Sequence, residues 1–157
     1  MSPLEKIQLY PAQICLIEFV AVSDITSYVR VKNFAAVITL AGQLTWNKLY
    51  ATPVNIQYSE KIELTSAGNI YRQELKSWFP GLDHNSIELL LQLLNIPLLI
   101  RITFQDSTSI VFGNPDEPMK LLPDFETGTR TGYPVTITGL TTERFRIIYE
   151  NIQSIPQ

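Results

Sequence analysis

This chain of 157 residues has one cysteine and one histidine. The single cysteine, Cys15, excludes an intramolecular disulfide and leaves a cysteine-based zinc site without a second thiolate. Such a chain fits a reducing compartment. The single histidine, His84, makes any triad of nucleophile, base and orienting acid depend on one residue. These scarcities argue against the common redox, zinc and hydrolytic chemistries.

The chain is also short of charge. Asp, Glu, Lys and Arg make up 17% of its residues, and the formal net charge is -3. A domain of this sign has no broad attraction to phosphate, so nucleic-acid binding is not the expected function. A protein surface with few charged residues often serves as a contact surface for another molecule.

Export and membrane signals are missing as well. The first residues, 1–13, show no basic run followed by an apolar stretch and a cleavage site, so a secretory signal is not expected. The longest apolar-rich stretch, 87–100, contains polar residues and a proline and is shorter than the roughly 20 residues that span a bilayer. We therefore expect no contact with a membrane.

What the chain has is β-type patterning. β-branched and aromatic residues recur in short runs separated by turn residues, at a length that suits one domain over residues 1–157. Two pairs of runs, 56–79 and 100–113, predict β-hairpins, and Glu60 breaks the alternation of the first, which predicts a bulge or an interface there. The runs predicted as strands are 14–22, 28–31 and 34–42 (two strands or one bent strand), 56–64, 70–79, 100–104, 109–113, 133–138 and 145–149, and residues 45–50 form a short aromatic segment.

One helix is predicted, over about residues 86–95, with Asn85 as its N-cap and Glu88 placed to complete a capping box. Residues 114–131 contain three prolines and no clean period, so they predict a long loop. The predicted fold class is mainly β (α+β), a β-sandwich or barrel with one flanking helix.

Candidate catalytic residues all have a simpler structural explanation. Cys15 lies in a run predicted to be buried on both faces, and His84 lies where a helix start favours polar side chains. The acidic pairs, Asp116 with Glu117 and Asp124 with Glu126, are predicted to be solvated loop charges. Phosphate-binding and dinucleotide motifs are absent. We therefore predict no enzymatic activity, and no catalytic, metal-binding or cofactor-binding residue.

Aromatic residues are the remaining candidates for binding. They are Trp46, Tyr50, Tyr71, Trp78 and Tyr133. With the nearby Lys48, Arg72 and Lys76 they could stack single-stranded nucleic acid, but aromatics in strands mostly pack within the sheet. A monomeric binding module for carbohydrate or protein, with an exposed Trp46, Trp78 or Tyr133 as its platform, is the alternative function.

Three stretches together resemble the tail-tube and head-to-tail connector subunits of tailed bacteriophages. The first ends in residues 44–49, the second is 68–71 leading into Leu75, and the third runs from Pro97 to Gly139. In the third stretch, a strand leads into a short loop, a long segment that contains prolines follows, and residues 131–139 form the last strand of the pattern.

The resemblance implies a tail-tube-like β-sandwich or barrel whose sheets continue one another around a ring. It implies a homo-oligomeric ring or tube in the virion, assembled in the host cytoplasm, that contacts neighbouring virion proteins and lets DNA pass. Such a subunit needs neighbours to satisfy its edge strands and an interface that closes by rotation. We expect residues 56–79 and 114–131 to make these contacts.

Overall fold

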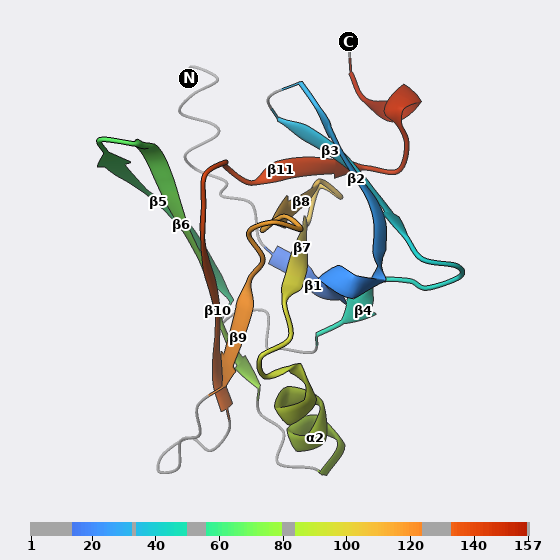
Figure 1. The fold of residues 1–157 in the computed structure, drawn as a ribbon. Coiled ribbons are helices and arrows are strands. Elements are labelled where there is room, and N and C mark those ends of the chain that lie inside the picture. The colour runs from blue at the N-terminus through green and yellow to red at the C-terminus, as the bar shows by residue number, and fades with distance from the viewer. Residues whose placement is uncertain (1–13, 33, 50–55, 80–83, 124–132, 157) are drawn as a thin grey trace, which may run out of the picture.

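The computed structural model describes residues 14–32, 34–49, 56–79, 84–123 and 133–156, which form two β-sheets and one α-helix (Figure 1). Sheet A has the order β2-β3-β11-β8-β7-β1-β4 and sheet B the order β5-β6-β10-β9. The strands of sheet A are β1 (Ile14–Ala21), β2 (Ile25–Val31), β3 (Ala35–Leu40), β4 (Asn47–Lys48), β7 (Leu98–Phe104), β8 (Ser109–Phe112) and β11 (Arg146–Tyr149). Those of sheet B are β5 (Gln57–Thr65), β6 (Gly68–Phe79), β9 (Lys120–Pro123) and β10 (Tyr133–Thr141), and the helix is α2 (His84–Leu93). The mainly β, sandwich-type fold with a flanking helix is confirmed.

The main core lies between the two sheets. Its fully buried side chains come from both, and they include Ile100, Ile102 and Phe112 of sheet A and Leu75, Leu121 and Ile137 of sheet B. Because side chains alternate between the two faces of a strand, only every second residue of β7 and β8 can point into this core. The residues between them lie on the far face of sheet A.

That far face carries a second, smaller core. Val20, Leu99 and Val111 are buried there, and side chains of the β2–β3 hairpin, among them Tyr28 and Ile38, pack over them. The hairpin reaches this position because β3 pairs in parallel with β11, at the end of the chain. Sheet A is therefore covered on both faces at its centre, which explains the continuous apolar run of β1.

Both predicted hairpins are present. β5 pairs with β6 from Gln57 and Lys76 to Thr65 and Gly68 without a break in register, and β7 pairs with β8. Of the two predictions for Glu60, a bulge or an interface, the bulge is therefore wrong. The alternation breaks there because the Glu60 carboxylate is used inside the sandwich.

The helix begins earlier than predicted. It starts at His84, so the assignment of Asn85 as its N-cap is wrong, although helix ends commonly differ by a residue or two from sequence expectations. Leu90 and Leu93 join the main core, as the predicted apolar face requires, and the exposed Leu91 points away from it. Asn95 takes a positive φ of 64°, which suits the residue that follows a helix. No helix within the described part of the chain is long and apolar enough to cross a bilayer.

The predicted loop 114–131 and the predicted end of a strand at Gly139 both need correction. Residues 120–123 form β9, which pairs with β10, and only 114–119 of the described residues form a connection. Gly139 lies inside β10, where the buried Met119 side chain packs against it. Gly139 therefore marks the close approach of the Met119 side chain to the strand and does not end the strand. Residues 124–132 lie outside the described part.

Candidate functional site

The β5–β6 hairpin extends beyond the sandwich at the side of the molecule shown on the left of Figure 1. On its inner face Tyr58 packs against Phe112, with ring centroids 5.0 Å apart. Four and six residues further along the strand, the same face carries Ile62 and Leu64, which are 53% and 82% exposed. We call Ile62 and Leu64 the hairpin tip. Sheet A covers the base of the hairpin and leaves the tip open.

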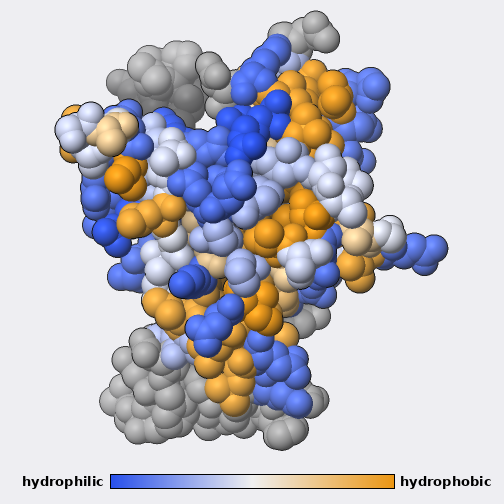
Figure 2. All heavy atoms as spheres, in the orientation of Figure 1, coloured by the Kyte–Doolittle hydropathy of each residue, from blue (hydrophilic) through white to orange (hydrophobic). Residues whose placement is uncertain are grey.

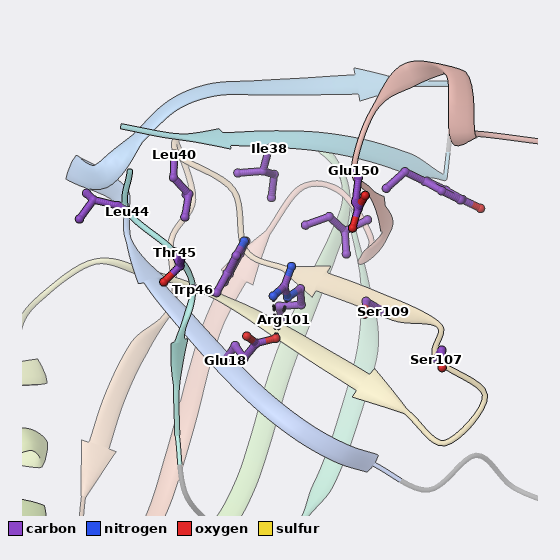
Figure 3. A pocket seen from close by; sticks show the side chains of 12 residues that line it. Glu18, Ile38, Leu40, Leu44, Thr45, Trp46, Arg101, Ser107, Ser109 and Glu150 are labelled. Atoms are coloured by element: carbon purple, nitrogen blue, oxygen red, sulfur yellow. Dashed lines mark hydrogen bonds and ion pairs between the residues drawn. The ribbon is translucent and has the colours of Figure 1, made fainter. Parts of the chain in front are cut away.

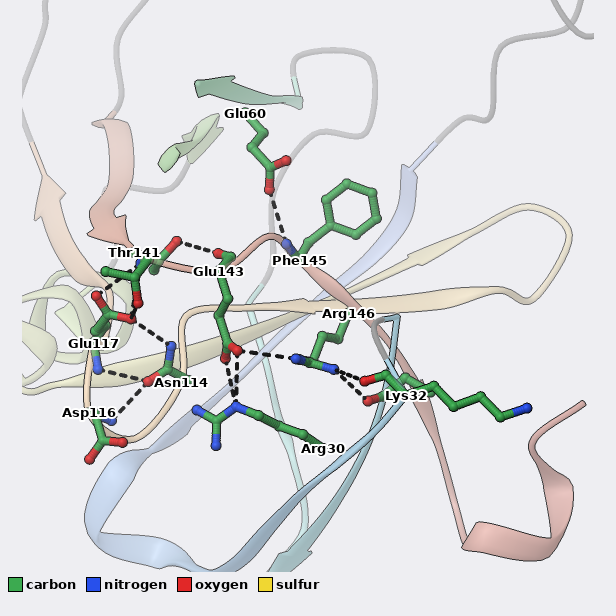
Figure 4. Close-up of polar contacts among 12 residues, drawn as sticks. Arg30, Lys32, Glu60, Asn114, Asp116, Glu117, Thr141, Glu143, Phe145 and Arg146 are labelled. Carbon is green, nitrogen blue, oxygen red and sulfur yellow. Dashed lines mark hydrogen bonds and ion pairs between the residues drawn. The ribbon is translucent and has the colours of Figure 1, made fainter. Parts of the chain in front are cut away.

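A buried carboxylate fixes the base of the hairpin. Glu60, whose side chain is 6% exposed, accepts hydrogen bonds from Gln73 Nε2 at 3.0 Å and from the backbone N–H of Phe145 at 3.0 Å. It also pairs with Arg144 Nε at 2.8 Å. Figure 4 shows Glu60 reaching across to the connection between β10 and β11. The carboxylate therefore joins β5 and β6 to the start of the last strand of sheet A.

Gln73 extends this link into sheet A. Its side chain is 1% exposed, and its Oε1 accepts a hydrogen bond from the backbone N–H of Gly113 at 3.0 Å. Glu60, Gln73 and Gly113 thus form a continuous polar path through the apolar interior, in which each described member has a partner. Such fully bonded networks hold elements in one arrangement.

A second acidic group holds the same connection from the other side. Glu117 accepts hydrogen bonds from the backbone N–H and the hydroxyl of Thr142, at 3.0 and 2.8 Å, and from Asn114 Nδ2 at 3.3 Å. Glu117 is therefore not the solvated loop charge that was predicted. Its partner in that predicted pair, Asp116, is exposed, and Asp124 and Glu126 lie outside the described residues.

Glu143 forms an ionic cluster beside it. Arg30 Nε lies 3.0 Å from its carboxylate and Arg146 Nη2 lies 3.2 Å away, as Figure 4 shows. Arg146 is buried and also donates to the carbonyl oxygens of Lys32 and Ala35, each at 3.1 Å. Burial and the Glu143 charge raise the pKa of Tyr28, which stacks under Arg30, to about 12. This cluster fastens β11 to the β2–β3 hairpin.

We expect the stability of the protein to fall on acidification only below about pH 4.5. Burial raises the pKa of Glu60 and of Glu117, but their hydrogen bonds outweigh burial and hold both pKa values below the ordinary 4.5. A carboxyl whose pKa is lowered by folding stabilises the protein above its unfolded pKa and loses this effect as the pH falls through its folded pKa. Urea midpoints at pH 7 and 5.5 should agree, and those from pH 4.5 to 3 should decline.

Glu60→Gln and Glu117→Gln should each flatten that acid decline, and Glu63→Gln serves as the control. Glu63 is about half exposed and pairs only across the surface with Arg72 among the described residues. An acid decline of equal slope in all three variants would contradict the assignment of the pH dependence to Glu60 and Glu117.

A pocket of about 580 Å³ opens on the far face of sheet A, beside the second core (Figure 3). Its base carries the cross-strand pair Glu18 and Arg101, with Arg101 Nη2 2.7 Å from Glu18 Oε1. The Arg101 guanidinium also lies 4.7 Å from the centre of the Trp46 ring. Ile38 and Leu40 face this group from β3, as Figure 3 shows. The pocket thus combines an apolar wall with a fixed ion pair.

The structure separates the aromatic residues that the sequence grouped together. Trp78 is 4% exposed, so it cannot serve as a binding platform, because its indole is already packed. Trp46 lines the pocket and is half-buried under Arg101. Tyr71 lies on β6 opposite Ile62. The side chains of Tyr50 and Tyr133 lie outside the described part.

Cys15 is exposed, so the prediction of a buried thiol is wrong. The register of β1 against β7 shifts between Ile14 and Leu16, which turns Cys15 out of the alternation that buries its neighbours. His84 opens α2, and its side chain is not among those described. In the described part of the chain, no three His, Cys, Asp or Glu side chains gather in an arrangement that could hold a metal ion.

No family model, curated protein or solved structure matches this chain. What it does is therefore inferred from its own surfaces. Two of them stand out, the open hairpin tip and the pocket. The sequence predicted contacts for residues 56–79 but not the exposure of their tip, because alternation places Leu64 on the inner face without revealing where the opposite sheet ends. It missed the pocket, which joins residues from distant strands.

Proposed function

We propose that this chain is a structural subunit that assembles with copies of itself through the β5–β6 hairpin. The observation that carries the proposal is the exposure of Leu64 (82%) and Ile62 (53%) on the hairpin face that buries Tyr58 nearer the base. An apolar strand face that runs past its own core exposes surface that water disfavours. Association removes it from water.

The position of β5 in its sheet supports this. β5 is nine residues long and lies at the edge of sheet B, with β6 as its neighbour among the described strands. A long edge strand with unpaired backbone groups invites a partner unless it is blunted by proline, a bulge or short length. The described strand has no proline and no bulge, and its charged residues Lys61 and Glu63 lie on the outer face, away from the apolar one. Its base is also held by Glu60, so the hairpin tip is presented by a fixed support.

The assembly we propose is a ring or tube in the tail or connector of a bacteriophage virion, with DNA passing through it. The sequence pattern of residues 97–139 supports this context, and the net charge of -3 is compatible with it. We propose neighbouring virion proteins as further partners.

The monomeric binding module is the second candidate, and the pocket beside Trp46 is the observation that favours it. Its volume of about 580 Å³ lies within the range of ligand sites. A carbohydrate or protein ligand would have to bind against a tryptophan whose ring already stacks with Arg101. A protein that remains monomeric at all concentrations and binds a ligand at Trp46 would replace the assembly proposal.

We expect Leu64→Asp to weaken self-association. Removing a leucine side chain from an apolar contact costs about 2 kcal/mol, or roughly 30-fold in the dissociation constant. Sedimentation velocity over a concentration series should show the average mass of the wild type rising and that of Leu64→Asp staying lower. Since Leu64 is 82% exposed, the melting temperature of the Leu64→Asp variant should equal that of the wild type.

Leu91→Asp is the matched control, because Leu91 is 59% exposed on the outer side of α2. It should associate like the wild type. Wild-type protein that remains monomeric throughout the series, or Leu64→Asp that associates as strongly as the wild type, would refute the proposal.

A further inference from the structure

We propose that the pocket beside Trp46 receives the hairpin tip of a second copy of this chain, so that subunits join head to tail. The inference rests on the proposed function and adds the surface that the hairpin contacts. The two surfaces lie on different strands of different sheets, the tip on β5 of sheet B and the pocket on the far face of sheet A. One copy can therefore offer its tip and fill its pocket at the same time.

The apolar parts of the two surfaces match in kind. The tip presents two aliphatic side chains, Ile62 and Leu64, with no polar residue between them on that face. The pocket has an aliphatic wall made by Ile38, Leu40, Leu44 and Ile148. Leu44 stands at this wall with 51% of its surface exposed, although its side chain would be stabilised by burial. Each surface holds exposed aliphatic groups that the other would cover.

The pocket also has room for the tip. Its volume of about 580 Å³ falls within the 300–1,000 Å³ that is typical of pockets filled by drug-sized groups. The tip has to place only two aliphatic side chains in it, those of Ile62 and Leu64. Anchor residues of protein interfaces characteristically enter such pockets.

Charge favours the same pairing. Within the described residues, the pocket's Glu18 and Arg101 neutralise each other, and the exposed Glu150 has no ion pair and leaves its lining negative. Lys61 lies next to Ile62 on the outer face of β5, at the side of the tip, is exposed and forms no ion pair with another described residue. A copy docked by its hairpin would bring a positive group to a negative rim. Such pairs steer association and set orientation more than they add affinity.

The arrangement in space allows the chain of contacts to continue. In Figure 1 the hairpin leaves the molecule on the left, whereas β3 and the loop after it, which form one side of the pocket, lie on the right. Figure 2 shows apolar side chains gathered toward the right of this view and a few among polar ones on the left. A contact between two different patches is heterologous, and repetition of it yields a closed ring or an open filament. This is the interface type that a ring or tube requires.

Mixing two variants tests the inference. Leu64→Asp damages the tip and leaves the pocket intact, and Leu44→Asp damages the pocket rim and leaves the tip intact. Each variant alone should associate roughly 30-fold more weakly than the wild type. An equimolar mixture should form a heterodimer that grows no further, because the intact tip of one variant meets the intact pocket of the other. Sedimentation velocity with one variant fluorescently labelled measures this directly.

The outcomes separate the inference from the proposed function. If Leu44→Asp associates like the wild type while Leu64→Asp does not, the hairpin contacts another surface, and only the inference falls. If both variants are weakened but their mixture forms no heterodimer, head-to-tail docking is also refuted. If both variants associate like the wild type, the inference and the proposed function are both refuted. Leu91→Asp and the melting temperatures of all three variants exclude a folding defect.

Discussion

Met119→Ala should destabilise the protein by about 3 kcal/mol, since removal of a buried methionine side chain costs about 2–5 kcal/mol. Met119 is fully buried in the main core. Its backbone exchanges two hydrogen bonds with Leu98, at 3.0 and 2.8 Å, and its side chain fills the space between two glycines, Gly113 and Gly139. Few neighbouring side chains can move into the vacated volume, because the two glycines have none.

The same contact predicts how Gly139→Ala behaves. A Cβ at Gly139 would lie 2.7 Å from Met119 Cε and 2.9 Å from its Sδ, so the substitution should cost about 1–3 kcal/mol through overpacking. In the Met119→Ala background that clash is gone, and the cost should fall by about 1 kcal/mol, which is a typical coupling for residues in contact. The carbonyl oxygen of Pro118, 3.0 Å away, keeps the cost above zero.

Urea unfolding of the wild type, the two single variants and the double variant measures this cycle. Gly42→Ala provides a comparison, because Gly42 has a positive φ of 57° and open space around the position of a Cβ, so its cost is independent of Met119. Strictly additive free energies of unfolding for Met119→Ala and Gly139→Ala would contradict the packing described here.

Glu60→Ala should destabilise the protein by about 3 kcal/mol and should also weaken its association. The substitution leaves the amide of the buried Gln73 and the backbone N–H of Phe145 without their acceptor, and each unsatisfied buried donor costs about 1–3 kcal/mol. The pairing with Arg144 adds little, because that side chain is 58% exposed. The hairpin base would then be free to move relative to β11.

Glu60→Gln separates the roles of charge and hydrogen bonding. It retains one acceptor oxygen, so we expect a smaller loss of stability than in Glu60→Ala. Arg144→Ala is the control for the ion pair and should have little effect on the urea midpoint. Hydrogen exchange of the β5 and β6 amides should accelerate in Glu60→Ala more than that of β7 and β8. Equal acceleration in both hairpins would show that Glu60 does not act on the hairpin base in particular.

The strand content was largely predictable because its signals are local. Alternation over residues 56–64 and 70–79, together with the turn between them, predicts a hairpin from the period of two alone. The leucines of residues 89–94 predict the buried face of α2 in the same way. Where the prediction went wrong, at Cys15, Glu60 and Gly139, a partner from a distant segment decides the local structure.

The assembly surfaces were less accessible to sequence reasoning. The pattern of residues 56–79 indicates a hairpin suited to contacts. It does not distinguish Leu64 from Leu75, because both are leucines on the inner face of the hairpin, yet Leu64 is exposed and Leu75 is buried. The pocket depends on Glu18 pairing with Arg101, 83 positions away, and on β3 lying over both. Neither the residue types nor their distance in the sequence indicates that Glu18, Arg101 and β3 lie together.

The sequence by itself determined that this protein is mainly β, since period-two patterning, turn residues and a single helical run are properties of neighbouring residues. The scarcity of cysteine, histidine and charge, on which the prediction of no enzymatic activity rests, is likewise a property of the sequence alone. Only the tertiary structure decided which apolar faces are covered, because coverage depends on where the opposite sheet ends. It is this end of sheet A that leaves Leu64 exposed while Tyr58, on the same face of the same strand, is packed.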